Sequence, residues 1–217
     1  MIESDDVFDD DGTRPSGVER AVSVRLATVH GDFLAIGYLD RNRGEEQMVL
    51  VYGDVETEGA LTRLHSECLT GDVFGSKHCD CGEQLSAALG AIVKEGRGIL
   101  VYLQGHEGRG IGLLAKLRAM KLQAEGMDTV EANIAQGLPV DARDYQVAAD
   151  ILHDLGVRSV RLLSNNPRKR ESLQRHGIKI DSQVPLLIPP SEENKSYQWT
   201  KRDRLDHYLP HLDIAAD

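Results

Sequence analysis

Short aliphatic runs bounded by turn residues occupy the first part of the chain after residue 17. Three of these runs, at 22–27, 33–39 and 48–52, are rich in valine, leucine, isoleucine and tyrosine. Such residues favour pleated strands, and a His-Gly-Asp turn separates the first two runs. We therefore predict an antiparallel β-meander or a small β-barrel in this part of the chain.

The hydrophobic period changes after Gly82, where apolar residues begin to recur every three or four positions. Leu85, Leu89 and Ile92 fall on one helical face, and Gly96 is a typical helix stop. Strands alternating with helices then follow, which indicates an α/β sheet. We predict helices at about 113–125, 145–155 and 167–177, and buried strands at 99–103 and 157–163.

The order of these elements predicts a protein of the α/β (α+β) class. A β-rich N-terminal part is expected to pack on a mixed sheet with helices. We assign residues 18–190 to a single domain. Residues 1–17 are expected to form a disordered acidic tail, and residues 191–217 a polar C-terminal segment.

The formal net charge of −10 is concentrated at the start of the chain. Six acidic residues, and no lysine or arginine, stand among the first twelve residues. Long nucleic acids bind proteins through a basic field, so we exclude nucleic acid as a partner. A small phosphate ligand remains compatible with this charge, because it needs only a few local cations and backbone donors.

The sequence also argues against a membrane protein and favours a cytoplasmic one. No apolar run is long enough to span a bilayer, and the acidic start is the opposite of a signal peptide. Three cysteines are an odd number and too few for a disulfide framework. A reducing compartment, with the thiolates held by a metal, is the simplest expectation.

All three cysteines lie in one short stretch, HSECLTGDVFGSKHCDCGEQL, as Cys68, Cys79 and Cys81. Three protein ligands leave zinc a fourth position for water, whose pKa falls toward about 7 on the metal. A hydrolytic zinc site is therefore the favoured interpretation. Two alternatives stay open: the thiols are unrelated, or His65 or His78 supplies a fourth ligand and the metal only holds a loop together.

Two further segments carry features of phosphate binding. In YLQGHEGRGIGLLAKLRAMKLQ, a predicted strand ends in a glycine-rich loop with Arg109 that opens a helix. Loops of this kind are common, so the signal alone is weak. The segment SNNPRKRESL places Arg168 and Lys169 at the start of a short helix. A solvated helix start capped by Asn165 or Asn166 explains this segment equally well.

The chain resembles GTP cyclohydrolase II, the zinc enzyme that opens the imidazole ring of GTP at the start of riboflavin synthesis. The resemblance runs from about residue 22 to residue 188. It implies that residues 18–190 form one catalytic domain, that GTP is the substrate and that the protein is a homodimer. It rests on RLHSECLTGD, CDCGEQL, GHEGRGIGL, DTVEAN, DARDYQVAADIL and SNNPRKRESL, in that order.

The resemblance also implies a set of site residues. One zinc ion per chain would bind Cys68, Cys79 and Cys81, and Mg²⁺ would accompany the triphosphate. An amide and a carboxylate, at Gln84 and Glu107, are suited to the guanine edge, because a carboxylate accepts from two adjacent N–H donors. The implied substrate-binding residues are Arg63, Leu64, His65, Ser66, Glu67, Gln84, Glu107, Gly108, Arg109, Thr129, Ser164 and Lys169.

Asp141 and Arg143 match the family's general base and its nucleophile toward the α-phosphorus, a pair that would expel pyrophosphate. A guanidinium with a pKa above about 12 has no free lone pair unless a base removes its proton. Arg143 is therefore interpreted either as a covalent nucleophile or as an electrostatic stabiliser. Without the resemblance, the pair would be an ordinary loop acid and a surface base.

Met120 stands where the family usually has a tyrosine. It shares a helical face with Leu113, Leu117 and Ala124, so a packing role is the alternative interpretation. The family's tyrosine places a hydroxyl beside the zinc, which orients water or passes a proton, and a methionine does neither.

Three activities therefore remain in view. The favoured one opens GTP, releases pyrophosphate and retains the formyl group, because removal of formate expels a poor amine leaving group and depends more on a proton donor. The first alternative is the complete enzyme, which releases formate and gives the diaminopyrimidine precursor of riboflavin. The second is an inactive zinc-containing module that binds GTP.

Overall fold

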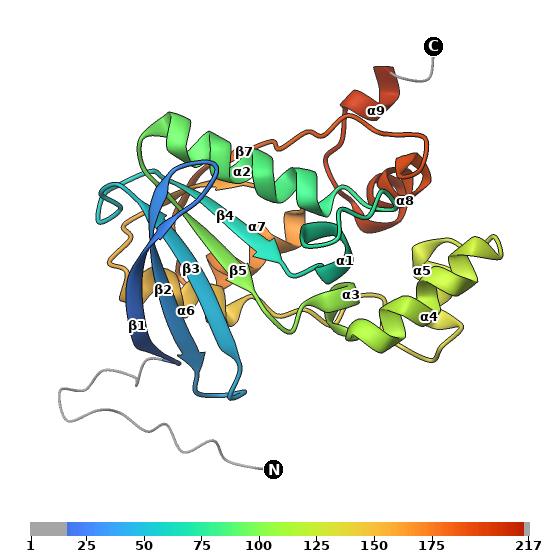
Figure 1. Ribbon diagram of the computed structural model, residues 1–217, viewed down its shortest axis with the longest axis horizontal. Helices are drawn as coiled ribbons and strands as arrows, with labels where there is room; N and C mark the ends of the chain where they lie inside the picture. The colour runs from blue at the N-terminus through green and yellow to red at the C-terminus, as the bar shows by residue number, and fades with distance from the viewer. Residues whose placement is uncertain (1–16, 215–217) are drawn as a thin grey trace.

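A single seven-stranded mixed sheet forms the centre of the protein in the computed structural model, which describes residues 17–214 (Figure 1). Its strand order is β1-β2-β3-β5-β4-β6-β7. The neighbouring pairs β1–β2, β2–β3 and β3–β5 are antiparallel. The pairs β5–β4, β4–β6 and β6–β7 are parallel. The strands are β1 (Val18–Ala27), β2 (Asp32–Asp40), β3 (Glu46–Tyr52), β4 (Ala60–Ser66), β5 (Gly98–Leu103), β6 (Val160–Leu163) and β7 (Ile180–Val184).

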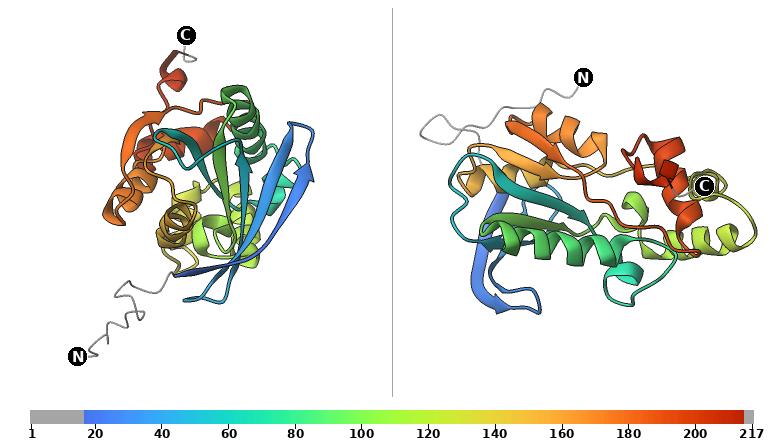
Figure 2. Two further views of the ribbon diagram at one scale, coloured as in Figure 1. Left: turned by 90° about the vertical axis from the view of Figure 1, so that its left-hand side faces the viewer. Right: turned by 90° about the horizontal axis from the view of Figure 1, so that it is seen from above.

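Helices cover both faces of the sheet (Figures 1 and 2). On one face, Ala88, Leu89 and Ile92 of α2 pack with apolar side chains of β2, β3, β4 and β5. On the other face, the buried residues of α6 and α7 pack with those of the same strands. The helices are α1 (Leu69–Asp72), α2 (Cys81–Glu95), α3 (Glu107–Gly110), α4 (Leu113–Ala124), α5 (Thr129–Ile134), α6 (Gln146–Asp154), α7 (Pro167–Arg175), α8 (Lys195–Leu205) and α9 (His211–Ile214).

The predicted α/β class and each predicted element are confirmed, with ends shifted by a few residues. The first three strands form a meander, and β3 pairs directly with β5, so the two predicted parts are joined edge to edge in one sheet. Gly96 ends α2 in the left-handed conformation with φ of 85°, as expected for a glycine stop. The acidic tail at residues 1–16 lies outside the described residues.

Strand β4 was not predicted from the sequence, although it is central in the sheet. Its sequence, ALTRLHS, contains Arg63 and His65, yet both side chains are buried. Polar residues are rare in a strand covered on both faces unless they have buried partners. These two side chains therefore point to a polar region enclosed at the end of β4.

The carboxyl ends of the parallel strands converge at one edge of the sheet. Ser66 ends β4, Leu103 ends β5 and Leu163 ends β6, and the loops that follow carry the three segments predicted to hold a metal or phosphate. Ligands of open α/β sheets bind beyond the carboxyl ends of the strands. Among the described residues, no helix combines the length and apolar character needed to cross a bilayer.

Candidate functional site

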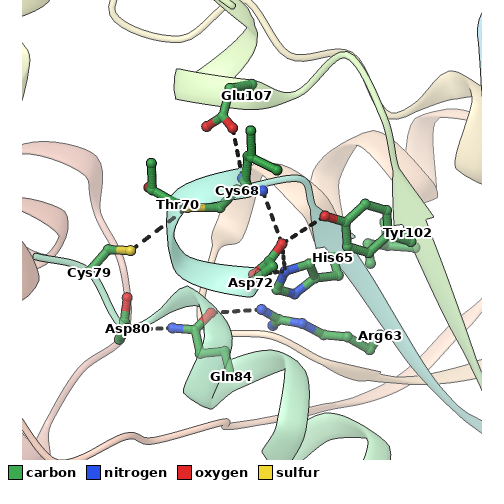
Figure 3. Close-up of polar contacts among 12 residues, drawn as sticks. Arg63, His65, Cys68, Thr70, Asp72, Cys79, Asp80, Gln84, Tyr102 and Glu107 are labelled. Atoms are coloured by element: carbon green, nitrogen blue, oxygen red, sulfur yellow. Dashed lines mark hydrogen bonds and ion pairs between the residues drawn. The ribbon is translucent and has the colours of Figure 1, made fainter. Parts of the chain in front are cut away.

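The three cysteines lie together, as their spacing predicted, and Figure 3 shows Cys68 and Cys79 facing each other. Cys68 precedes α1, while Cys79 and Cys81 lie at the start of α2. Their sulfur atoms all lie within 4.8 Å of one another, and those of Cys68 and Cys79 are 3.7 Å apart. Thiolates that converge in this way suit a tetrahedral zinc with one position free of protein ligands.

Gly71 allows the backbone of α1 to approach the thiols. A Cβ atom at this position would stand 2.9 Å from the sulfur of Cys79 and 3.1 Å from that of Cys68. Sulfur atoms this close leave no room for a side chain. The glycine is therefore required for the three thiols to converge, which supports a metal-binding role for the cluster.

His65 is turned away from the thiols and is not a fourth ligand. Its Nε2 donates to the carboxylate of Asp72, 3.0 Å from each oxygen, and the ring is buried. The same carboxylate accepts from the backbone N–H of Cys68 at 3.0 Å and from the hydroxyl of Tyr102 at 2.9 Å (Figure 3). Burial lowers the pKa of His65, so the ring stays neutral and holds Asp72, which in turn fixes Cys68.

Lys116 of α4 is a cation beside the thiols that the sequence analysis missed. Its Nζ donates to the sulfur of Cys68 at 3.1 Å, to the hydroxyl of Thr70 at 2.8 Å and to Glu107 Oε1 at 2.6 Å. Hydrogen bonds from the other two thiols, together with the charge of Lys116, lower the pKa of Cys68. Cys68 is thereby held as a thiolate, the form that binds metals.

A cavity of about 100 Å³ opens beside the thiols. The half-buried side chain of Met120 forms part of the cavity wall. Leu113 and Leu117, which were predicted to share a helical face with Met120, are exposed to solvent. The predicted residues that line this cavity are Ser66, Glu67, Cys68, Cys79, Cys81, Glu107, Gly108, Arg109, Met120, Thr129 and Arg143.

A second, strongly basic cavity adjoins the first. Lys169 is buried here, its Nζ donates to the carbonyl oxygen of Leu64 at 2.7 Å, and burial followed by the charges of Arg63 and Arg143 lowers its pKa well below the usual value. Arg63 is also buried, and its Nε has no partner among the described residues. An anion would satisfy this donor and offset the clustered charge. The predicted residues of this cavity are Arg63, His65, Ser66, Cys81, Gln84, Arg109, Arg143 and Lys169.

Arg143 and Asp141 form a buried pair, contrary to the view that they are an ordinary surface acid and base. Arg143 Nε donates to Asp141 Oδ1 at 2.9 Å, and one terminal nitrogen donates to Oδ2 at 2.7 Å. Only 12% of the Arg143 side chain and 6% of the Asp141 side chain are exposed. Burial opposes the charge of Arg143, but Tyr145 and Asp141 outweigh it and raise the arginine's pKa.

Gln84 and Glu107 are oriented by protein partners. Gln84 accepts from Arg63 at 2.7 Å and donates to Asp80 at 2.6 Å (Figure 3). Glu107 accepts from the backbone N–H of Leu69 at 2.7 Å as well as from Lys116. Gln84 therefore lines the basic cavity with its carbonyl oxygen and one N–H engaged, and Glu107 lines the thiol cavity with its carboxylate fixed.

The glycine-rich loop places Arg109 between the two cavities. Arg109 has a positive φ of 66°, and one of its terminal nitrogens donates to the hydroxyl of Thr129 at 2.7 Å. Gly108 and Gly110 also adopt positive φ. Glycine does so without steric strain, so these two residues permit the tight turn around Arg109. In α7, Asn166 caps the helix, as one interpretation of that segment predicted, and Arg168 is exposed while Lys169 is buried. Phosphate binding by this segment stays a prediction.

Leu64 and Ser164 occupy the interior and do not line either cavity. The side chain of Leu64 is buried in the core, and Ser164 Oγ accepts from the backbone N–H of Asn166 at 3.1 Å. Contact between a nucleotide and Leu64 would have to use backbone atoms.

Leu64→Ala is therefore expected to destabilise the fold without changing the site. We expect the free energy of unfolding to fall by about 2–5 kcal/mol, the range for truncating a buried leucine, with the KM for the nucleotide unchanged in folded protein. Denaturant titration and steady-state kinetics measure the two effects. A raised KM at undiminished stability would contradict this placement.

Comparison with known proteins gives concordant findings. The family model described as GTP cyclohydrolase II matches residues 19–185. The "GTP cyclohydrolase-2" of Streptomyces coelicolor is 66% identical over 215 residues, which is 99% of this chain and 97% of that protein. The "Riboflavin biosynthesis protein RibBA" of Mycobacterium tuberculosis is 53% identical over 90% of this chain, and the chain spans 47% of that protein's length.

A solved structure is also similar. It is that of RibBX from A. baumannii, described as a two-domain 3,4-dihydroxy-2-butanone 4-phosphate synthase. It matches with a TM-score of 0.48 and 18% sequence identity, over 84% of this chain and 53% of that one.

Proposed function

Since the chain belongs to the GTP cyclohydrolase II family, we propose that it is a zinc-dependent hydrolase that opens the imidazole ring of GTP at C8 and releases pyrophosphate. We propose further that it retains the formyl group and yields a formylamino-pyrimidine ribonucleotide monophosphate. The observation that carries this proposal is a methionine, Met120, in the wall of the thiol cavity.

Cys68, Cys79 and Cys81 are the residues that would hold the zinc. When bound, zinc lowers the pKa of a water ligand and so supplies hydroxide near neutral pH. Lys116 and Asp72 hold Cys68 in place through its sulfur and its backbone N–H. The protein would thus contribute three converging thiol ligands and an adjoining cavity for the base.

The two cavities suggest how the nucleotide lies. Its purine would enter the thiol cavity, where Glu107 is fixed for guanine recognition, and its triphosphate would occupy the basic cavity near Arg63 and Lys169. The unpartnered Nε of Arg63 supports this orientation. We propose that Mg²⁺ accompanies the triphosphate, whose charge the buried cations partly offset.

Release of pyrophosphate would depend on Arg143. Its guanidinium is paired through two nitrogens with Asp141 and carries a raised pKa, so the side chain stays protonated. A protonated guanidinium has no lone pair for attack on phosphorus. We therefore assign Arg143 to electrostatic stabilisation of the phosphoryl group, with Asp141 orienting it, rather than to a covalent intermediate; water would attack the α-phosphorus directly as pyrophosphate leaves.

Retention of the formyl group follows from the chemistry of the second hydrolysis. Deformylation must protonate a poor amine leaving group, and this step gains from a positioned proton donor. Met120 lines the thiol cavity where the family usually places a phenol, and a thioether donates no proton. Ring opening breaks the bond from C8 to the other nitrogen, N9, whose lone pair is conjugated with the pyrimidine carbonyl. N9 is therefore the better leaving group, and its departure depends less on a positioned proton donor.

The complete enzyme, which releases formate and gives the riboflavin precursor, is the second candidate. The 66% identity to a protein named GTP cyclohydrolase-2 favours it. An inactive GTP-binding module is less consistent with the site, because it would need neither the three thiols nor the Arg143 pair. For each of these candidate activities, we propose that the protein is a cytoplasmic homodimer.

Met120→Tyr is expected to gain formate release, because the variant places a hydroxyl beside the thiols. The larger side chain costs on the order of 1–3 kcal/mol of stability if the site cannot relax. Formate per ring-opened GTP is the measurement, made at matched folded fraction. Met120→Phe is the control, because it adds the same ring without the hydroxyl and should release no formate.

Two outcomes would contradict the role of Met120. Stoichiometric formate from the wild-type protein would show that a hydroxyl at position 120 is dispensable. Equal formate release from the Tyr and Phe variants would show that ring volume, and not the proton donor, controls deformylation.

A further inference from the structure

The C-terminal helix α8 lies against both cavities, although it follows the segment that the family model matches. In Figure 1, α8 sits beside the start of α2 and across from α4 and α5. Tyr197 of this helix lines the thiol cavity and the basic cavity alike, and Lys201 lines the basic one. From the sequence, this region was predicted only to be a polar segment.

Lys201 fastens α8 to the loop that carries two of the thiols. Its Nζ donates to Asp80 Oδ1 at 2.5 Å, and only 11% of the Lys201 side chain and 2% of the Asp80 side chain are exposed. The second oxygen of Asp80 accepts from Gln84, which in turn accepts from Arg63. A continuous chain of four side chains, three of them buried and Gln84 half-buried, thus connects α8 to the arginine with the unpartnered Nε.

Tyr197 lies where the two cavities meet. Both cavities are lined by the same five residues: Ser66, Cys81, Arg109, Arg143 and Tyr197. A nucleotide with its purine in one cavity and its triphosphate in the other must pass its ribose between these residues. Lys201 Nζ lies 4.5 Å from the centroid of the Tyr197 ring, so the same lysine that holds Asp80 also holds this ring.

We propose that α8 is part of the nucleotide-binding site, with Tyr197 in contact with the ribose of bound GTP and Lys201 as a positioning residue for Tyr197, Asp80 and Gln84. This inference rests on the proposed function, since it takes GTP as the ligand. An aromatic ring at the junction covers the sugar and excludes water from it.

Substitutions on α8 separate binding from folding. Tyr197→Leu removes the ring but leaves the Lys201–Asp80 pair, and Trp199→Leu removes an exposed aromatic residue from the same helix as a matched control. The probe is 7-deaza-GTP, whose five-membered ring lacks the amidine nitrogen and cannot be opened. Its Kd is measured by calorimetry on the zinc-loaded protein, with zinc content and thermal unfolding recorded for each variant.

We expect Tyr197→Leu to weaken binding by about tenfold, a typical loss for an aromatic contact, while Trp199→Leu binds as the wild type does. Lys201→Met is expected to raise the KM for GTP more than it lowers kcat, with Lys201→Arg restoring most of the affinity. A Tyr197→Leu protein that is folded, zinc-loaded and binds the probe with wild-type Kd overturns the inference.

These measurements distinguish a failure of the α8 inference from a failure of the proposed function. If the wild type binds 7-deaza-GTP but does not open GTP, the proposed activity fails while the α8 contact is still judged by its own variants. If the wild type opens GTP and the α8 variants match it in KM and Kd, the inference fails while the activity stands.

Discussion

Cys79→Ser is expected to lose ring-opening activity by more than about a thousandfold, because water without the metal has a pKa near 15.7 instead of about 7. A serine hydroxyl is a poor zinc ligand, and the two remaining sulfurs do not complete the site. Metal analysis should find about one zinc per chain in the wild type and much less in the variant. Loss of zinc and of GTP turnover should coincide.

Ser86→Ala is the matched control, because Ser86 is an exposed residue of α2, the helix that begins at Cys81, and its hydroxyl pairs with His30. It should retain both zinc and activity. Pure, active wild-type protein without zinc or another divalent ion would refute the metal site, and so would a Cys79→Ser protein that keeps wild-type turnover.

Arg143→Ala is expected to lower pyrophosphate release by on the order of 100-fold or more, the range for removing one charge-stabilising donor from a site. Ring opening of the triphosphate should persist, because the thiols and Lys116 are untouched. The measurement is pyrophosphate and ring-opened product from the same reaction. Normal pyrophosphate release would remove Arg143 from the mechanism.

The Arg143→Ala variant needs a control for the buried charge that it leaves on Asp141. Arg143 is not an exposed loop residue, and its loss leaves Asp141 buried with only Arg168 nearby, at 3.4 Å. Removing one partner of a buried pair destabilises a protein. The double variant with Asp141→Asn and Arg143→Ala avoids the unpaired charge. Arg170→Ala, which replaces an exposed arginine of α7, is the control for the general effect of removing an arginine.

Much of the fold could be predicted because its elements bury regular apolar patterns. The helix at α2 shows this best, since Ala88, Leu89 and Ile92 are buried at helical spacing and a glycine ends it. Strand β4 could not be found in this way. Arg63 and His65 interrupt its apolar pattern, and the polar partners that allow their burial, Gln84 and Asp72, lie elsewhere in the sequence.

The candidate site was predictable where ligands are close in sequence and not where they are distant. The spacing of the three cysteines was enough to place their sulfurs together. Lys116 lies 48 residues from Cys68 and Lys201 lies 121 residues from Asp80, and no local pattern marks either pair. Tertiary packing, and no local pattern, brings Lys116 of α4 to Cys68 and Lys201 of α8 to Asp80.

The central claim is that the protein opens GTP and stops before formate is lost. Mass spectrometry of the wild-type product tests it most directly, because the formyl-retaining and deformylated nucleotides differ by one CO unit. The account predicts a formylamino-pyrimidine ribonucleotide monophosphate that accumulates with pyrophosphate and without formate. A product that is fully deformylated, with one formate per GTP consumed, would contradict it.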